Sequence, residues 1–308
     1  MLTRMTVLAL TWAVLGTSPA WADYTLQRQL ALAPGGTFVL DADVGSVTVT
    51  GDSAPGALVA LTAADDDFER TFDVQIEERA GVASVRVKRR LSWTSELFGG
   101  GWFRGRDVRL TIRVPRSTTV SMRTSGGALH VERLDGPVNL KTSGGSIDVR
   151  GIRGNVDADT SGGGITVADV RGAVRADTSG GPIEIDAVTG AIDARTSGGG
   201  VRIRGAGGRV DARTSGGGVT VGFAPGNSQG GNLSSSGGAV RAEIDPAVSL
   251  SVEASSSGGG VQSDVPVTVR GRISRNSLSG DLNGGGSLLR LRSSGGGVRV
   301  AASSTARP

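Results

Sequence analysis

The sequence contains no cysteine and only one histidine, His130, in 308 residues. The absence of cysteine excludes disulfides, thiolate metal sites, cysteine nucleophiles and a lipidated N-terminal cysteine. Because His130 stands alone, a metal site with several histidines is impossible, and any serine–histidine–aspartate triad would have to use it. We therefore expect no metal, no cofactor and no catalytic residues.

Aromatic residues make up 4% of the chain, and the only lysines are Lys88 and Lys141. The formal net charge is +4, so the pI of about 10.4 reflects the many arginines and not a strong basic field. Proteins that bind nucleic acids usually gather arginine and lysine on one face. The sequence gives no sign of such a face, so we expect no nucleic-acid partner.

Long apolar runs are also missing. The most apolar segment, Val7 to Gly16, is much shorter than the ~20 residues that a membrane span needs. It follows the basic Arg4 and precedes the small-x-small triplet Ala20, Trp21, Ala22. This order predicts a signal peptide over residues 1–22, cleaved near Ala22, and a periplasmic or secreted mature chain without a transmembrane segment.

What the sequence has in abundance is glycine, with 51 residues, and a repeat. The tetrapeptide TSGG recurs every 18 residues, beginning at Thr124, Thr142, Thr160, Thr178, Thr196 and Thr214. Looser copies begin at Ser235, Ser256 and Ser293, the last after a gap of 37 residues, so we expect the array to lose regularity there. A fixed period of this length is typical of a solenoid.

Each repeat alternates apolar and polar residues. With the threonine of TSGG as position 0, positions 5, 7, 14 and 16 are apolar, whereas positions 6, 15 and 17 are mostly polar or charged. A period of two predicts two short strands per repeat, and the glycines at positions 2, 3 and 12 are expected to supply positive φ angles at the turns. The threonine itself is expected to face inward and bond the turn backbone.

These observations predict an all-β chain folded as a parallel β-solenoid, or β-helix, of two-strand coils of about 18 residues. The repeats would occupy residues 124–302, and residues 303–308 would form a disordered tail. The period fails over residues 23–123, although alternation persists there. We expect this part to form an N-terminal β cap and the first coils, because an open solenoid end would expose unpaired backbone groups.

One segment concentrates aromatic residues. The sequence WTSELFGGGWF is flanked by basic residues on both sides, at 88–90 and at 104 and 106. Its side chains either cover the core of the cap from a long hairpin, or form an exposed loop that binds a protein, a glycan or an anionic membrane surface. The candidate interaction residues are Trp93, Phe98, Trp102, Phe103, Arg104 and Arg106.

Other candidate chemistry lies in the repeats. His130, at position 6, is expected to be a solvated residue one coil from Asp148. Asp157 and Asp159 point outward about 6.5–7 Å apart, in the range of an inverting glycosidase pair, with Asp177 one coil away. Sugar subsites usually also contain aromatic residues, and none are available there, so we interpret these carboxylates as a solvated charge row.

Three segments carry a family resemblance: GTFVLDADVGSVTVTGD, the TSGG(x)I(x)V series and GGGSLLRLRSSGGGVRV. They resemble the bacterial putative adhesin family of β-strand repeat proteins over roughly residues 35–302. The resemblance implies an extracytoplasmic, right-handed β-helical domain. The leading hypothesis is a non-enzymatic envelope or secreted adhesin-like scaffold that binds an envelope macromolecule. The alternatives are a polysaccharide-active β-helix enzyme and, by family analogy, an envelope-stress sensor.

Overall fold

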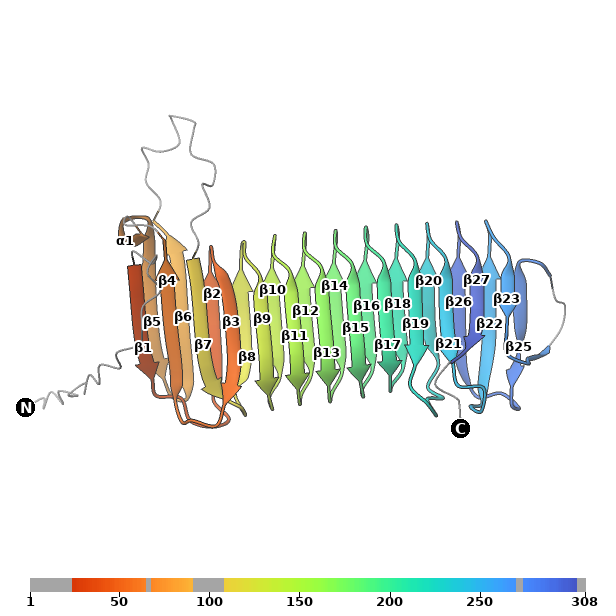
Figure 1. Ribbon diagram of the computed structural model, residues 1–308, viewed down its shortest axis with the longest axis horizontal. Helices are drawn as coiled ribbons and strands as arrows, with labels where there is room; N and C mark the ends of the chain where they lie inside the picture. Colours follow the sequence, from red (N-terminus) through yellow and green to blue (C-terminus); the bar gives the residue numbers. More distant parts are fainter. Residues whose placement is uncertain (1–23, 65–67, 91–107, 270–273, 304–308) are drawn as a thin grey trace, which may run out of the picture.

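The computed structural model describes residues 24–64, 68–90, 108–269 and 274–303. Over these residues the chain forms a rod of two long facing β-sheets (Figure 1). The only helix among them is the single turn α1 (Phe68–Thr71). The prediction of an all-β, solenoid-like fold is therefore confirmed, while its right-handed winding stays a prediction. The predicted signal peptide and aromatic loop lie outside the described residues.

Both sheets consist mostly of parallel strands. In spatial order, the 13-stranded sheet contains β1 (Tyr24–Leu30), β4 (Ala57–Ala63), β7 (Val108–Pro115), β3 (Ser46–Asp52), β9 (Leu129–Leu134), β11 (Ile147–Ile152), β13 (Ile165–Val170), β15 (Ile183–Val188), β17 (Val201–Ala206), β19 (Val219–Phe223), β21 (Val240–Ile244), β27 (Val298–Ala302) and β23 (Val261–Ser263).

The 14-stranded sheet faces it. Its strands, in spatial order, are β24 (Thr268–Val269), β25 (Ser277–Leu282), β22 (Leu250–Ser256), β26 (Ser287–Ser293), β20 (Gly231–Ser235), β18 (Val210–Thr214), β16 (Ile192–Thr196), β14 (Val174–Thr178), β12 (Val156–Thr160), β10 (Val138–Thr142), β8 (Thr119–Thr124), β2 (Thr37–Ala42), β6 (Val82–Arg89) and β5 (Phe72–Arg79).

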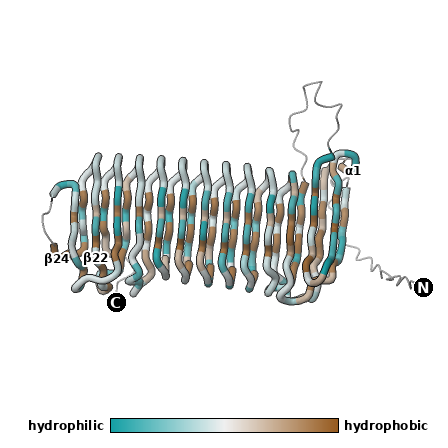
Figure 2. The backbone as a smooth tube through the Cα atoms, turned by 180° about the vertical axis from the view of Figure 1, so that it is seen from behind, coloured by the Kyte–Doolittle hydropathy of each residue, from teal (hydrophilic) through white to brown (hydrophobic). Residues whose placement is uncertain are grey.

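The repeat sets the register between coils. Val138 pairs with Val156, and Val156 with Val174, so each residue lies beside its equivalent 18 residues along the chain. The predicted inward positions are confirmed, since Ile165 and Ala176, for example, are at most 1% exposed. On the outer face Arg175 is exposed, whereas Thr166 is half-buried because neighbouring coils flank it. Figure 2 shows this alternation of hydrophobic and hydrophilic residues along the individual strands.

The glycines of the TSGG corner have a different role from the one expected. Between residues 126 and 217, only Gly127 among the glycines at positions 2, 3 and 12 has a positive φ, of 105°. Position 3 needs glycine because the coils approach closely. A Cβ at Gly145 would fall on the carbonyl oxygen of Gly127 in the neighbouring coil, and Gly163 and Gly181 repeat this relation. The prediction of positive φ at these corners was therefore wrong for most coils.

In the five regular coils from Thr124 to Thr196, a left-handed residue lies instead at position 9. Its φ is 61° at Arg133, 63° at Gly151, 55° at Asp169, 53° at Ala187 and 64° at Gly205. Only two of the five are glycines, so composition gave no signal for this kink. The kink lies within the strand, and the next residue, at position 10, is buried and still pairs with its equivalent in the neighbouring coil, as Ile152 does with Val170.

The hydroxyl at position 0 ties neighbouring coils together, as predicted. It donates to the carbonyl of a glycine in the preceding coil at 2.6–3.3 Å and accepts the N–H of its own position-3 glycine at 2.8–3.4 Å. The buried ladder comprises, in spatial order, Thr142, Thr160, Thr178, Thr196, Thr214, Ser235, Ser293 and Ser256.

This spatial order corrects the expectation of a degenerate C-terminal array. The coil β26–β27 lies between β20–β21 and β22–β23, although it follows both in the sequence. At the other end, the coil β2–β3 likewise lies between β6–β7 and β8–β9. The 37-residue gap before Ser293 therefore reflects a changed order of coils, and Ser235, Ser256 and Ser293 all keep their places in the hydroxyl ladder.

The outermost strands differ between the two ends. At the N-terminal end, β1 and β5 pair antiparallel with their neighbours, and the rings of Tyr24, Phe68 and Phe72 stack at centroid distances of 4.8 and 5.1 Å. At the other end, the edge strands β23 and β24 have three and two residues. Short or charged edge strands oppose end-to-end addition.

The close approach at the corner predicts that alanine substitution has a large effect at one of two adjacent glycines and a small effect at the other. Gly145→Ala should destabilise the protein by about 1–3 kcal/mol or more, because its Cβ would meet the backbone of the next coil. Gly144→Ala should stay within about 1 kcal/mol of the wild type, since the nearest atom outside its chain neighbours, the carbonyl oxygen of Ser125, would lie 3.9 Å from its Cβ. Urea unfolding of both variants tests this, and equal losses would contradict it.

The hydroxyl ladder supplies a second matched pair. Thr178→Val leaves the carbonyl of Gly163 and the N–H of Gly181 without their hydroxyl partner and should cost about 1–3 kcal/mol. Thr124 is also buried, but its hydroxyl has no hydrogen-bond partner among the residues that the structure describes. Thr124→Val should therefore be neutral or stabilising. A loss at Thr124 as large as that at Thr178, measured by thermal melting, would refute the ladder's contribution.

Candidate functional site

The six candidate interaction residues Trp93, Phe98, Trp102, Phe103, Arg104 and Arg106 all lie outside the described residues, as does the remainder of the segment 91–107. The structure does describe the basic residues that precede them. Lys88 contacts Asp41 and Asp43 at 2.8 and 3.0 Å. Arg90 contacts Asp73 at 3.6 Å. These two cations are therefore engaged within the chain.

The same cluster shifts two pKa values. The hydrogen bond to Asp41 is the main cause that raises the pKa of Lys88. Burial alone would raise the pKa of Asp43, but the backbone N–H of Arg89 and the Lys88 ammonium outweigh it and hold this pKa below its ordinary value. The guanidinium of Arg89 lies 5.8 Å from the ring centroid of Phe72. This cluster stabilises the N-terminal end of the rod.

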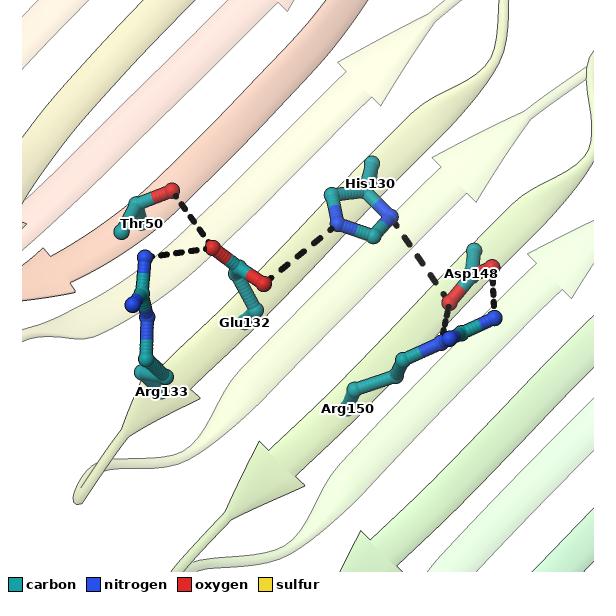
Figure 3. Close-up of polar contacts among 6 residues, drawn as sticks. All are labelled: Thr50, His130, Glu132, Arg133, Asp148 and Arg150. Carbon is teal, nitrogen blue, oxygen red and sulfur yellow. Dashed lines mark hydrogen bonds and ion pairs between the residues drawn. The ribbon is translucent and has the colours of Figure 1, made fainter.

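His130 lies where the sequence predicts, in the outer row of β9 and paired in register with Asp148 of β11. Its Nε2 is 3.9 Å from Glu132 and its Nδ1 is 3.7 Å from Asp148. These carboxylates are also held by Arg133 at 2.6 Å and Arg150 at 2.9 Å. They lie on opposite sides of the imidazole (Figure 3), so they do not converge on one nitrogen. The arrangement is a surface ladder of ion pairs.

The three aspartates that suggested a glycosidase pair lie on the outer face of the 14-stranded sheet. Asp159 pairs in register with Asp177, while Asp157 lies two residues earlier in the same strand as Asp159 and pairs with Arg175. Two of the three already contact cations: Asp159 lies 4.0 Å from Lys141, and Asp177 lies 2.8 Å from Arg175. The structure thus brings these carboxylates near one another within rows that contain both acidic and basic residues.

Two grooves border this face. One, of about 620 Å³, follows positions 13 to 15 and is lined by small residues such as Pro137 and Ala173 beside Asp157 and Asp193. The other, of about 500 Å³, follows the TSGG corner, and its lining includes Asp159, Asp177, Arg195, Arg213, Ser161, Ser179, Ser197, Ser215 and Ser236. Equivalent positions of successive coils line both grooves, so each extends along the rod. The sequence analysis did not predict these grooves. The only signals for them in the sequence are the small residues at position 13 and the serines at position 1.

The described residues offer no group of three or more histidines, aspartates or glutamates placed to hold a metal ion. They also include no helix long and apolar enough to cross a bilayer.

Residues 40–300, most of the chain, match the Toastrack DUF4097 family. The chain belongs to this family. Membership fits the two long, mostly parallel sheets and the resemblance seen in the sequence. No curated protein matches the chain.

Solved structures similar to this Toastrack chain come from several bacteria. A Bacteroides fragilis protein named "putative adhesin" is 13% identical, with a TM-score of 0.44, over 91% of this chain and 98% of that one. A Parabacteroides distasonis protein named "putative lipid binding protein" is 11% identical, with a TM-score of 0.49, over 90% of this chain and 96% of that one.

The Asp43 cluster predicts a pH dependence. Because the folded-state pKa of Asp43 lies below its ordinary value of 3.8, the ionised carboxylate stabilises the fold above about pH 4, and this contribution is lost as the pH falls through the folded-state pKa. Asp43→Asn should lower the free energy of unfolding by roughly 0.5–1 kcal/mol at neutral pH. Near pH 2 it should have no effect on this free energy.

The control for this prediction is Asp157→Asn, which removes a carboxylate without an ion pair among the described residues. It should leave the unfolding midpoint unchanged at both pH values. A loss at Asp43 that persists at low pH would contradict the assigned contribution of its charge.

Proposed function

We propose that this protein is a non-enzymatic, adhesin-like scaffold that binds a macromolecule of the bacterial envelope. The observation that carries this proposal is the arrangement of polar side chains on the described coils. They form rows along the rod and do not converge on one point. A row that repeats the same groups at each coil, about 4.8 Å apart, suits an extended or repeating partner better than a small substrate.

The proposed location is extracytoplasmic, either periplasmic or secreted. It rests on the signal-peptide pattern of residues 1–22, with cleavage near Ala22, and on the resemblance to adhesin-like proteins. We further propose that residues 23–123 include a cap, that the coils 124–302 wind right-handed, and that residues 303–308 form a tail.

A polysaccharide-active enzyme is less well supported. An inverting pair needs one carboxylic acid that donates a proton and one carboxylate that activates water. Asp159 and Asp177 contact Lys141 and Arg175, as members of a charge row would. An envelope-stress sensor has no specific observation in its favour.

The proposed contact segment is the aromatic loop at 91–107. On the described residues, the only large hydrophobic side chain that is exposed is Val82, at 39%. Apolar contact with a partner is therefore best supplied by Trp93, Phe98, Trp102 and Phe103, with Arg104 and Arg106 beside them. The rings of Tyr24, Phe68 and Phe72 already stack at the N-terminal end of the rod, which favours an interaction role for the loop over a covering role.

The double variant Trp102→Ser/Phe103→Ser tests this proposal. It should abolish co-sedimentation with envelope fragments or with anionic liposomes and leave the melting temperature intact. As a structural control, Phe72→Ser removes a buried ring and should lower stability by about 3–5 kcal/mol. A double variant that melts early but sediments normally would refute the loop as the contact segment.

A further inference from the structure

The changed order of coils at the C-terminal end assembles a surface strip that the sequence does not show. On the outer face of the 14-stranded sheet, one column crosses β18, β20, β26 and β22, which are neighbours in space (Figure 1). The strand register aligns its members as Arg213, Ser234, Arg292 and Ser255. Arg292 thus lies between two serines that precede it in the chain.

A row of corner serines accompanies this column. Each follows the position-0 hydroxyl of its coil and is exposed: Ser215, Ser236, Ser294 and Ser257. Their backbones keep the coils in step, since Gly237 N donates to Ser215 O at 2.9 Å and Ser294 N donates to Ser235 O at 3.1 Å. Arg213, Ser215, Ser234 and Ser236 line one end of the 500 Å³ groove. We call this column and row together the Arg–Ser strip.

The groups of the Arg–Ser strip are free to bind a ligand. Arg213 and Arg292 are exposed, and neither guanidinium forms an ion pair or hydrogen bond with any residue that the structure describes. Most other arginines on this sheet face are engaged, for example Arg195 with Asp193 at 2.6 Å and Arg290 with Glu253 at 2.8 Å. Within the described ranges, the four corner serine hydroxyls likewise lack protein partners.

The acidic residues next to the Arg–Ser strip are already occupied. Asp211 accepts a hydrogen bond from Asn232 at 2.6 Å and contacts Arg209 at 3.4 Å. Glu253 contacts Arg290. The surrounding charge also changes along the rod: residues 124–194 contain ten acidic and six basic residues, whereas residues 195–303 contain six acidic and twelve basic ones. The Arg–Ser strip therefore lies in the part of the repeat region whose sequence has an excess of basic residues, which favours the approach of an anion.

We propose that the Arg–Ser strip binds an acidic polysaccharide in an extended conformation. Guanidinium groups bind carboxylates through paired, charge-assisted hydrogen bonds, and serine hydroxyls exchange hydrogen bonds with sugar hydroxyls. The two arginines lie two coils apart, about 9.6 Å, with a serine between them. A sugar ring with its linkage is about as long as one coil spacing of roughly 4.8 Å, so acidic groups on alternate sugars would meet Arg213 and Arg292 in turn.

This inference rests on the proposed binding function and names its ligand class and its site. The experiment uses the full mature chain and polygalacturonate, a carboxylated polysaccharide, in titration calorimetry at low salt. Dextran of similar length serves as the neutral probe, and a single-stranded DNA oligonucleotide as the other polyanion. We expect polygalacturonate to bind, with an affinity that falls as salt is added, and dextran and DNA to bind at least about tenfold more weakly.

The variant Arg213→Gln/Arg292→Gln should weaken polygalacturonate binding at least about tenfold, because it removes two charge-assisted contacts. Its melting temperature should not change, since neither side chain has a partner in the described structure. The control Arg171→Gln/Arg202→Gln removes the same charge from exposed arginines without ion pairs elsewhere on the rod. It should bind within about twofold of the wild type if the site is local.

Equal losses in the two double variants would overturn the Arg–Ser strip as the site, and equal binding of DNA would overturn its assignment to polysaccharide. Ser236→Ala/Ser294→Ala should weaken polygalacturonate binding severalfold, less than the double arginine variant does. If the affinity did not fall, the assignment of these serines to sugar hydroxyls would be overturned. Envelope co-sedimentation separates this inference from the proposed function. If the wild type binds polygalacturonate through the Arg–Ser strip but no envelope fragment, the adhesin-like function fails while the site stands.

Discussion

The close stacking of one coil on the next is the constraint on which the rest of the structure depends. At the TSGG corner the backbones approach so closely that Gly145 and Gly163 have no room for a Cβ. This approach brings the position-0 hydroxyl within reach of a carbonyl in the neighbouring coil, as Thr160 donates to Gly145 O at 2.8 Å. Because a coil cannot bury its apolar face alone, stability comes from these contacts between neighbours.

The two ends of the rod follow from the same constraint. A regular solenoid would expose a parallel edge at each end, ready to pair with another chain. Here the outermost strands at each end are antiparallel to their neighbours or very short. Just inside each end lies a coil that is out of sequence order, β2–β3 at one end and β26–β27 at the other. Each of these coils is held between two others, so neither can leave without separating its neighbours.

The thin, filled core also shapes what the protein can do. Inward positions are taken by side chains such as Ile165 and Ala176, which leaves the outer rows and corners as the chemically available surface. Carboxylates there face cations of the same or the next coil, as Asp148 faces Arg150 at 2.9 Å. A surface of this kind favours binding over catalysis, because binding to an extended partner needs repeated contacts and catalysis needs convergent ones.

The sequence by itself determined the strands, their inward faces, the parallel stacking and the hydroxyl ladder, because each depends on a short period that local residue types reveal. The sequence did not reveal why the corner residues are glycines. A positive φ and a close approach of two backbones both require glycine, and only the fold shows that close approach is the reason here. Nor did the sequence show any sign of the left-handed kink at Asp169 or Ala187. Only the tertiary structure decided the order of coils, because pairing between distant segments depends on the path of the whole chain. That order places Arg292 beside Ser234 and Ser255, and no local pattern could have joined them.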